Sequence, residues 1–505
     1  MYSKGKKFFV LVSFLMLALT ASAQTQFGEQ PKLVVGIVVD QMRWDYLSRY
    51  YDKFTGNGFK RLIDDGYSCN NCLINYLPTI TAIGHTSVYT GASPAFHGIC
   101  GNTFYIDGKR TYCTGDTTMQ TVGATGKKGQ HSPHNLLSTT IGDQLRLHTD
   151  FRSRVVGVSY KDRAAILPAG HSANAAFWLD TKNLCFVTST YYMNALPDYA
   201  VRVNEAIAKN KEAQKAGERI GYTPLCGTIT TDMAIAAMQG EGLGRGEATD
   251  MLCVSYSQTD VIGHEWGTRG DNTDQAYLQL DKDLGRLIDA IDAQVGRGNY
   301  LLFLTADHAA AHNWKFMNDH KLPAGPLHHE DVVKAIDDYV ASKLKVTGSV
   351  LNDILDYRVY LNRQSISSQG LDYQQVKETV MEYLRTLKGV VTVVDQEKTR
   401  ISAIPQLLQD RILMGYHPRR SGDIIIIPEP QYYSWWKSNP PTHTTHGEWN
   451  PYDSHIPLLF YGWHIGHGAT SREVHITDIA PTVCQLLHIQ QPNACVGEPI
   501  LEITK

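Results

Sequence analysis

Residues 251–264 read MLCVSYSQTDVIGH, and this stretch decides the fold. Its first half is an apolar run that ends in polar residues, which is typical of a strand buried on both faces of a sheet. Its second half places Asp260 and His264 four residues apart, so one helical turn brings both side chains to the same side. A buried strand that ends in an acid and passes into a helix predicts an α/β sheet.

The same pattern occurs elsewhere in the chain. Short runs rich in Val, Ile and Leu that end in a polar residue or glycine cover Lys32–Asp40, Arg154–Asp162, Tyr300–Asp307 and Ile456–Gly462. Helical spacing of apolar residues follows over Thr273–Val295, and a shorter helix is predicted over Asp478–Leu487 with Thr477 as its N-cap. We therefore predict an α/β fold with a doubly wound, mostly parallel sheet between helices. The functional groups of such sheets gather at the carboxyl ends of the strands.

Two stretches interrupt the alternation of strands and helices. Residues 172–230 show no clear buried strand, and residues 315–440 combine helices, a few strands and turn-rich segments. We interpret both as cap insertions over the strand ends of a single domain at 24–505. An independent second domain is the alternative.

The N-terminus has the features of a secretory signal peptide over residues 1–23. Three lysines precede an apolar run, Phe8–Leu19, that is too short to span a membrane, and Ala21-Ser22-Ala23 forms a small-residue cleavage site. Cleavage after Ala23 predicts a periplasmic or secreted protein. No cysteine stands immediately after that site and no later run is apolar over about 18 residues, so we expect no membrane anchor.

Export would permit disulfides. The chain has nine cysteines, an odd number, so at least one has no partner within the chain. Cys69 and Cys72 have C-x-x-C spacing without a second pair at zinc-finger distance. We expect a loop disulfide or two buried thiols there, and we place Cys253 in the core.

Composition excludes several classes of protein. The 505 residues carry 47 Lys plus Arg against 50 Asp plus Glu, a formal net charge of −3, which argues against a basic nucleic-acid-binding surface. A hydrophobic fraction of 43% excludes an intrinsically disordered chain. The sequence has no internal repeat of the kind that builds a solenoid.

Carboxylates and imidazoles stand at the predicted strand ends. Their oxygen and nitrogen donors suit zinc, with manganese and iron as competitors. One histidine alone is more commonly structural, but the whole set at one sheet edge indicates a metal site. The candidate ligands are Asp40, Asp260, His264, Asp307, His308 and, in the loop before the Ile456 strand, His446.

A candidate nucleophile lies in residues 78–86, which read PTITAIGHT. A neutral threonine is a poor nucleophile, but a metal ion lowers the pKa of its hydroxyl. If Thr81 begins a helix, the free N–H groups there also favour an anion. The alternative is that Thr79 and Thr81 only cap the helix.

These segments resemble the alkaline phosphatase superfamily, in particular its secreted, broad-specificity, phosphate-irrepressible bacterial alkaline phosphatases. Seven separated motifs match in order through nearly the whole mature chain. They are residues 38–45, 78–86, 98–102, 161–163, 260–264, 306–308 and 445–447.

The resemblance implies two zinc ions and a role for each motif residue. Asp260, His264 and His446 would hold one ion. The other would be held by Asp40, Asp307, His308 and the hydroxyl of Thr81. His446 is preferred to His455 because members of the family carry their last zinc histidine in a Thr-His-Gly-like loop, and His443 has the weakest claim.

The resemblance also implies a reaction. Thr81 would attack phosphorus and form a phospho-threonine, while Asn102, Lys161 and Arg163 would bind the phosphoryl oxygens. Lys161 would take the place of the magnesium ion that some members use, so no magnesium is expected to be required. The absence of a C/S-x-P-x-R motif in residues 78–86 argues against a sulfatase.

We therefore predict an exported, zinc-dependent alkaline phosphatase that hydrolyses phosphate monoesters of small metabolites, with a monomer favoured. One alternative is a phosphodiesterase or nucleotide pyrophosphatase of the same superfamily, which usually lacks the Lys161/Arg163 pair. The other is an exported metal-binding protein without catalytic activity.

Overall fold

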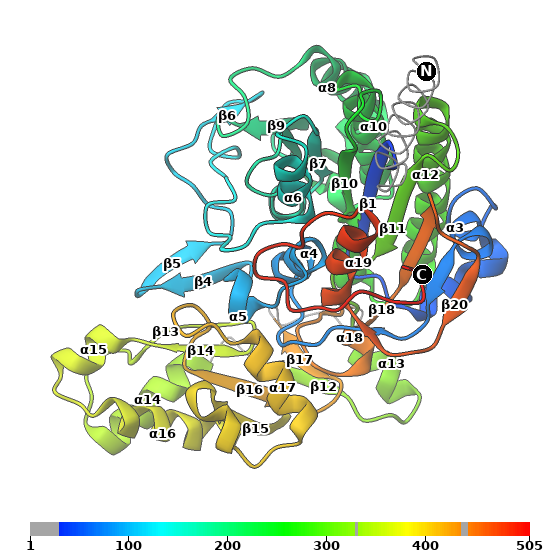
Figure 1. Cartoon of the computed structure of the whole chain (residues 1–505). Coiled ribbons are helices and arrows are strands. Elements are labelled where there is room, and N and C mark those ends of the chain that lie inside the picture. Colours follow the sequence, from blue (N-terminus) through cyan, green and yellow to red (C-terminus); the bar gives the residue numbers. More distant parts are fainter. Residues whose placement is uncertain (1–29, 329–331, 436–442, 505) are drawn as a thin grey trace, which may run out of the picture.

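A computed structural model describes residues 30–328, 332–435 and 443–504 (Figure 1). Its largest element is a ten-stranded sheet. In spatial order the strands are β20 (Gly468–Thr470), β2 (Tyr67–Cys69), β19 (Leu458–Gly462), β11 (Tyr300–Thr305), β1 (Leu33–Val39), β10 (Asp250–Tyr256), β7 (Val155–Ser159), β8 (Ala175–Asp180), β9 (Cys185–Ser189) and β6 (Thr121–Val122). The predicted α/β class is confirmed, because this sheet lies between helices.

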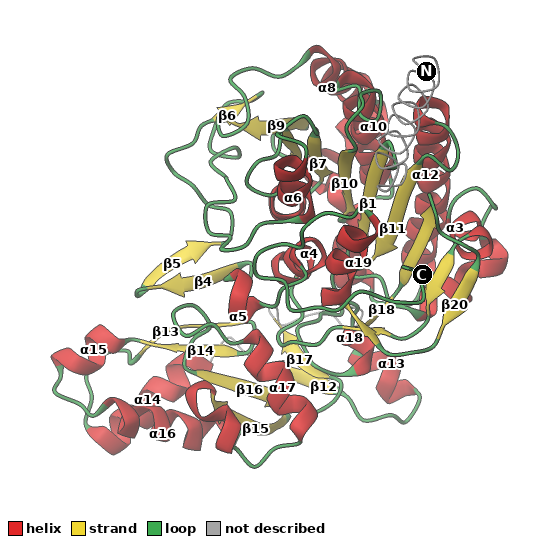
Figure 2. Ribbon diagram, viewed as in Figure 1, coloured by secondary structure: helices red, strands yellow, loops and turns green. Residues whose placement is uncertain are grey.

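The centre of the sheet is parallel. β1 pairs with β10 on one side and β11 on the other, so Val34 faces both Met251 and Leu301, and β10, β7 and β8 continue in the same direction. Every residue of β1 is buried. Figure 2 shows why: α4 (Thr81–Thr90), α6 (Ile141–His148) and α19 (Ile479–Leu486) lie on one side of the sheet, and α10 (Leu225–Gly240) and α12 (Asp271–Val295) on the other.

The predicted helices are present, but one cap is wrong. The helix expected over 273–295 is α12, with Leu280, Leu284 and Ile288 buried. α19 begins at Ile479, and its N-cap is Asp478 rather than Thr477. Thr477 lies in a preceding 3₁₀ turn, where its hydroxyl accepts a hydrogen bond from Asn75.

The run at residues 456–462 is the exception to the predicted parallel order. β19 pairs antiparallel with β11, so Phe460 lies opposite Phe303. The prediction of a parallel strand is wrong here because the chain enters β19 from the edge at which β11 ends. The loop before β19, which contains His446, therefore lies at the carboxyl edge of the parallel strands.

The first predicted cap insertion is also partly wrong. Residues 172–230 contain β8 and β9, which are strands of the main sheet, and all six residues of β8 are buried. β8 reads AAFWLD and lacks the β-branched residues that mark a strand, so the apolar pattern gave little signal. Outside the sheet this range holds α8 (Asp198–Lys209), α9 (Lys211–Ala216), a 3₁₀ turn over Gly217–Tyr222 and the start of α10.

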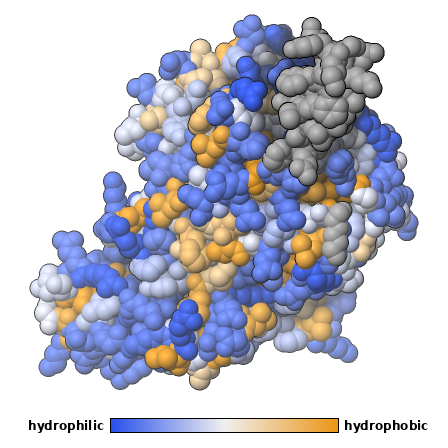
Figure 3. All heavy atoms as spheres, in the orientation of Figure 1, coloured by the Kyte–Doolittle hydropathy of each residue, from blue (hydrophilic) through white to orange (hydrophobic). Residues whose placement is uncertain are grey.

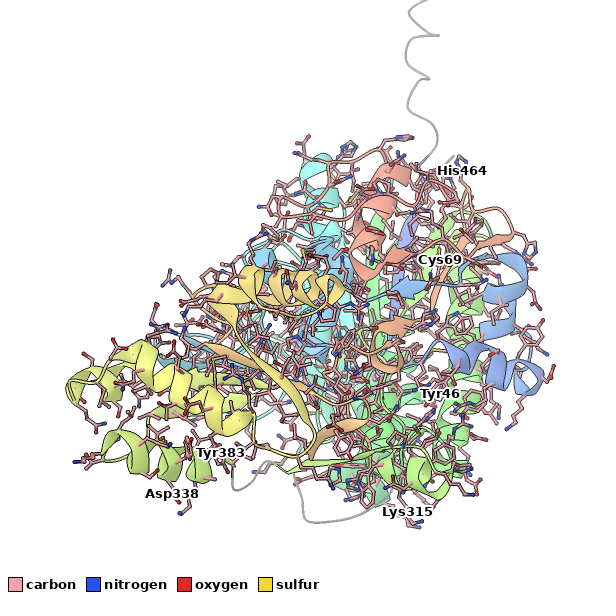
Figure 4. All side chains as sticks on the ribbon, turned by 90° about the horizontal axis from the view of Figure 1, so that it is seen from below. Tyr46, Cys69, Lys315, Asp338, Tyr383 and His464 are labelled. Carbon is pink, nitrogen blue, oxygen red and sulfur yellow. The ribbon has the colours of Figure 1, made fainter. Side chains whose placement is uncertain are left out.

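The second predicted insertion contains a separately packed small lobe, which we define as residues 332–428. Its four-stranded sheet has the order β13 (Leu351–Leu355), β14 (Arg358–Leu361), β16 (Ile424–Pro428) and β15 (Val390–Asp395). α14 (Val332–Leu344) and α16 (Tyr373–Leu384) cover it, and Ile336, Val359 and Val380 share its core. Tyr383 and Asp338 on these helices lie far from Cys69 on the main sheet (Figure 4).

The cysteines are free thiols, and Cys69, Cys72 and Cys253 are buried. For the C-x-x-C pair the structure therefore agrees with two buried thiols. The predicted signal peptide lies outside the described residues. Among the residues that are described, no helix is both long and apolar enough to cross a membrane. The face shown in Figure 3 is largely hydrophilic, with scattered apolar patches.

Candidate metal centre

The carboxyl edge of the parallel strands brings the predicted acids together. Asp40 follows β1, and Asp307 and His308 follow β11; all three side chains are fully buried. β10 leads into α11 (Gln258–Trp266), whose first turn carries Asp260. Three neighbouring parallel strands thus deliver carboxylates to one place, as the position of functional groups in such sheets predicts.

The first ligand group consists of Asp260, His264 and His446. Asp260 Oδ1 lies 3.1 Å from Nε2 of His264, one helical turn later, and 3.7 Å from Nε2 of His446. His446 arrives from the loop before the antiparallel strand β19. The histidine predicted from the loop is therefore brought to the centre.

The second group consists of Asp40, Asp260 and His308. Asp40 Oδ1 lies 3.5 Å and Asp307 Oδ2 lies 3.4 Å from His308 Nε2. Asp307, predicted as a ligand beside Asp40 and His308, lies close to His308 but is not one of the three residues whose ligand atoms all lie near one another. Asp260 belongs to both groups.

The three imidazoles are oriented by backbone carbonyls. The Nδ1–H groups of His264, His446 and His308 point to the carbonyl oxygens of Thr444 at 2.8 Å, Thr79 at 2.7 Å and Ala309 at 3.0 Å. Each Nε2 lone pair then faces the carboxylates. Burial lowers the pKa of His308 and His446, which keeps them in the neutral form that binds metals.

The carboxylates fit a cation. Asp40 Oδ1 and Asp307 Oδ2 are buried and accept no hydrogen bond, although a buried charged oxygen without a donor is costly. Burial, and then the charge of Asp307, raises the pKa of Asp40 well above its usual range. Oxygen and imidazole donors of this kind suit zinc, manganese or iron.

Lys161 lies between the two groups. Its Nζ donates to Asp40 Oδ2 at 2.7 Å and to Asp260 Oδ2 at 2.6 Å. It occupies the N-cap position of α7 (Asp162–Ala169), directly beyond β7. The buried ammonium therefore adds a fixed positive charge to the centre.

Thr81 is the first residue of α4, and its hydroxyl lies 3.4 Å from His308 Nε2. The N-cap of α4 is Ile80, and no side chain caps this helix. Thr79 bonds instead to the backbone of Glu448 and Gly447. Neither threonine is a helix cap, so the capping alternative fails and the Thr81 hydroxyl faces the metal ligands.

Two predicted phosphate-binding residues lie beside the start of α4 and α7. Asn102 Oδ1 accepts a hydrogen bond from the N–H of Ala82 at 3.2 Å. Arg163 Nη1 donates to the hydroxyl of Tyr112 at 3.1 Å, and that hydroxyl donates to Asp162 at 2.7 Å. Asp162, the acid at the end of the predicted strand over Arg154–Asp162, bonds to Tyr112 and pairs with Lys128 at 3.1 Å.

Other histidines lie elsewhere. His455, the alternative to His446, stacks on Trp44 and bonds to the carbonyl of Asn70. His443 lies 3.7 Å from Glu265. Neither is a member of the two ligand groups.

Sequence reasoning missed two residues beside the ligands. Gln41 donates from its backbone N–H to Asp307 and from Nε2 to Asp260 at 2.6 Å, and its φ is +64°. His85 Nδ1 lies 3.2 Å from Asp307 Oδ2 but bonds to the carbonyl of Thr81 at 2.9 Å. A signal for His85 was present, because it stands one helical turn after Thr81. Gln41 had no signal beyond its position next to Asp40.

Known proteins with similar sequences cover almost the whole chain. A protein of Myroides odoratus named calcium-transporting ATPase is 42% identical, covering 97% of each chain. Alkaline phosphatase PafA of Elizabethkingia meningoseptica is 41% identical over 98% of this chain and 99% of its own. Alkaline phosphatase PhoV of Synechococcus elongatus is 40% identical over 94% of this chain and 93% of its own.

The structures agree with the sequences. The crystal structure of PafA superposes with a TM-score of 0.90, covers 95% of this chain and 100% of its own, and is 42% identical. The model of the type I phosphodiesterase/nucleotide pyrophosphatase family matches residues 34–449, which include β1, the start of α4, α11 and the His446 loop. The chain therefore belongs to the type I phosphodiesterase/nucleotide pyrophosphatase family, within the alkaline phosphatase superfamily.

Proposed function

We propose that this protein is an alkaline phosphatase that hydrolyses phosphate monoesters, with Thr81 as nucleophile and two zinc ions at the ligand groups. The observation that carries the proposal is the position of the Thr81 hydroxyl. Thr81 begins α4 without capping it, and its hydroxyl lies 3.4 Å from His308 Nε2 beside buried carboxylates. Two relatives at about 40% identity are named alkaline phosphatases.

Asp260, His264 and His446 would hold one ion, and Asp40, Asp307, His308 and Thr81 the other. Zinc bound there would supply Lewis-acid chemistry, lowering the pKa of the attacking hydroxyl and stabilising charge on the leaving oxygen. The Lys161 ammonium already fills the space between Asp40 and Asp260. This supports the expectation that no magnesium ion is required.

Each side chain then has its own role in the phosphoryl transfer. Arg163 and Asn102 bind non-bridging oxygens, and Lys161 adds positive charge that favours a dianion. The Thr81 hydroxyl gives its proton to water and Oγ1 forms a bond to phosphorus as the bond to the ester oxygen breaks. Water returns a proton to the leaving oxygen, which departs as the alcohol. Water then attacks the phospho-threonine, the Oγ1–phosphorus bond breaks, and Thr81 recovers its proton as phosphate leaves.

The name of the Myroides relative is compatible with this chemistry. An ATPase also transfers a terminal, doubly charged phosphoryl group to water, so the same residues would serve both reactions. We include ATP among the substrates to be tested. Export to the periplasm or medium, a monomeric state and small phosphorylated metabolites as substrates complete the proposal.

The test compares two esters on the purified, zinc-loaded protein. We expect kcat/KM for p-nitrophenyl phosphate to exceed that for its methyl diester, and metal analysis to give two zinc ions per chain. A preference for the diester would favour the phosphodiesterase alternative. Metal binding without turnover of either ester would favour the non-catalytic alternative.

A further inference from the structure

The hairpin between β13 and β14 has an unusual tip. Leu355 pairs with Arg358, so Asp356 and Tyr357 alone make the turn, and their φ angles are +50° and +63°. Turns of this kind favour Asn-Gly or Asp-Gly, because a left-handed conformation costs roughly 1–2 kcal/mol for a residue with a side chain. A tyrosine in that conformation indicates that its ring is needed at this place.

The tip belongs to the small lobe but reaches the candidate metal centre. Arg358, fully buried, donates to the carbonyl oxygens of Cys100 at 2.7 Å and Leu77 at 2.9 Å, and thereby fixes the hairpin on the main body. The Tyr357 ring lies so close to Gly447 that a Cβ there would be 2.8 Å from Cε2. Ile80 contacts the same position.

The residues near Tyr357 in space are therefore adjacent in sequence to proposed catalytic residues. Gly447 follows His446 in the chain, and Ile80 precedes Thr81. Tyr357, 6% exposed, packs against Gly447, and the Ile80 side chain borders the same position.

Asp356 stands on the other side of the tip, against the phosphate-binding residues. A Cβ at Gly101 would lie 2.7 Å from its Oδ2, and Asn102 is the next residue. Burial raises the pKa of Asp356 to about 6, and the charges of Arg358 and Arg163 oppose that rise. Among the described residues, the structure gives this carboxylate no hydrogen bond or ion pair.

We propose that Asp356 and Tyr357 form a wall of the phosphatase site that restricts it to terminal phosphates, an inference that rests on the proposed function. A phosphate monoester presents three small non-bridging oxygens, to which Asn102, Arg163 and Lys161 can donate hydrogen bonds. A diester replaces one of them with an organic group, which needs space beside these residues. Asp356 lies against Gly101, the residue before Asn102, and Tyr357 lies against Gly447, the residue after His446.

The wall is distinct from the charge of Lys161 and Arg163. Charge favours a dianion at any shape of pocket, whereas the wall excludes a second substituent by volume. Removing the wall should therefore raise diester turnover while the charged residues stay in place.

The chain supplies a matched control turn. β4 (Thr103–Ile106) and β5 (Lys109–Tyr112) are joined by Asp107 and Gly108, also with positive φ angles of +50° and +76°. Asp107 is exposed and nothing lies within 4 Å of a Cβ at Gly108. Asp107→Asn should leave kcat/KM unchanged for both the monoester and the diester.

The test is kcat/KM for p-nitrophenyl phosphate and its methyl diester in Tyr357→Gly and in the double variant D356N/Y357G, which gives the tip the favoured Asn-Gly sequence. We expect the diester-to-monoester ratio to rise about tenfold or more over the starting protein, the size expected when a pocket gains room for a small group. Tyr357→Asn, which also tolerates positive φ, serves if Tyr357→Gly does not fold.

The outcomes separate the two proposals. A variant with the circular dichroism and thermal unfolding of a folded protein, but an unchanged ratio, would overturn the wall. A starting protein that already prefers the diester would overturn the proposed function, whatever the variants do. A rise in the ratio with Asp107→Asn unchanged supports the wall.

Discussion

Lys161 Nζ lies 2.6 Å from Oδ2 of Asp260, a carboxylate shared by both ligand groups. The same ammonium bonds to Asp40, and 8% of the lysine is exposed. Two buried carboxylates are therefore joined by one cation. The carboxylates hold the positive charge where a phosphoryl dianion would meet it.

Lys161→Ala should lower kcat/KM for a monoester by about 10- to 100-fold, the value of a hydrogen bond to a charged group. The loss for a methyl diester should be smaller, because the diester carries one negative charge fewer. Lys53→Ala, which removes an exposed lysine paired with Asp274, is the control. Equal losses for both esters at full zinc content would mean that Lys161 does not face the substrate charge.

Thr81→Ala should abolish turnover of both esters by a factor on the order of 10⁴ or more, as removal of a nucleophile does elsewhere. Thr81→Ser should keep part of the activity and form a phospho-serine. Acid quenching and mass spectrometry of the starting protein should detect phosphate on Thr81. Thr86→Val, five residues further along α4, is the matched control, because the Thr86 hydroxyl donates to the carbonyl of Ala82 within the helix. Retained turnover in Thr81→Ala would remove Thr81 from the mechanism.

The pair His446 and His455 offers a direct test of the ligand assignment. His446→Ala should lower zinc affinity and stoichiometry, because its Nε2 faces Asp260. His455→Ala should leave the zinc content at two ions per chain and lower stability, because it loses a stack on Trp44. Isothermal titration and metal analysis of both variants measure the difference. Loss of zinc from His455→Ala alone would reverse the assignment.

The strands and ligands that were predictable share a strong local signal. The strands at residues 32–40 and 300–307 are buried on both faces and end in acids, and Asp260 and His264 are one helical turn apart. By contrast, β8 was missed because AAFWLD lacks β-branched residues. The direction of β19 was missed because a short apolar run reads the same in either direction, and its partner is set by the whole fold.

The second layer of the site depends on tertiary contacts that no local pattern contains. Gln41 reaches both Asp260 and Asp307 only because β1 lies between β10 and β11. Tyr112 meets Arg163 across about 50 residues of sequence, and the Tyr357 tip arrives from another lobe. The motif residues were predictable because they stand in short segments whose order along the chain is recognisable. The residues that contact them from elsewhere in the fold were not predictable.

Tyr112→Phe should change the orientation of Arg163 without removing any charge. The variant loses the hydroxyl that links Arg163 Nη1 to Asp162. We expect a loss of roughly 3- to 10-fold in kcat/KM, corresponding to about one neutral hydrogen bond. If Tyr112 acts by positioning Arg163, Arg163→Ala should lower kcat/KM less in the Tyr112→Phe background than in the starting protein. A double-mutant cycle measures this difference. Full additivity would show that the two residues act independently. Tyr105→Phe on the same hairpin is the control.

Because of His97, the free energy of unfolding should be lower in mild acid than at neutral pH. It is fully buried at the end of α5 (Pro94–His97), and burial lowers its pKa to about 3, against an ordinary value of 6.5. Between these values the unfolded chain binds a proton that the folded protein does not. The free energy of unfolding therefore falls as the pH falls below 6.5, by about 1.4 kcal/mol per pH unit until the folded pKa is reached.

His97→Asn removes this titration and keeps one of the two bonds, because the amide oxygen can replace Nδ1, which accepts from the N–H of Ile99, while the bond of Nε2 to Ser87 is lost at every pH. Urea unfolding at pH 6 and pH 4.5, with a chelator present so that metal release does not contribute, measures the effect. The variant should lose about 2 kcal/mol less than the starting protein over this interval. His134→Asn, which changes a half-exposed imidazole, should reproduce the starting protein. An unchanged pH slope in His97→Asn would show that His97 takes up its proton in the folded state as readily as in the unfolded chain.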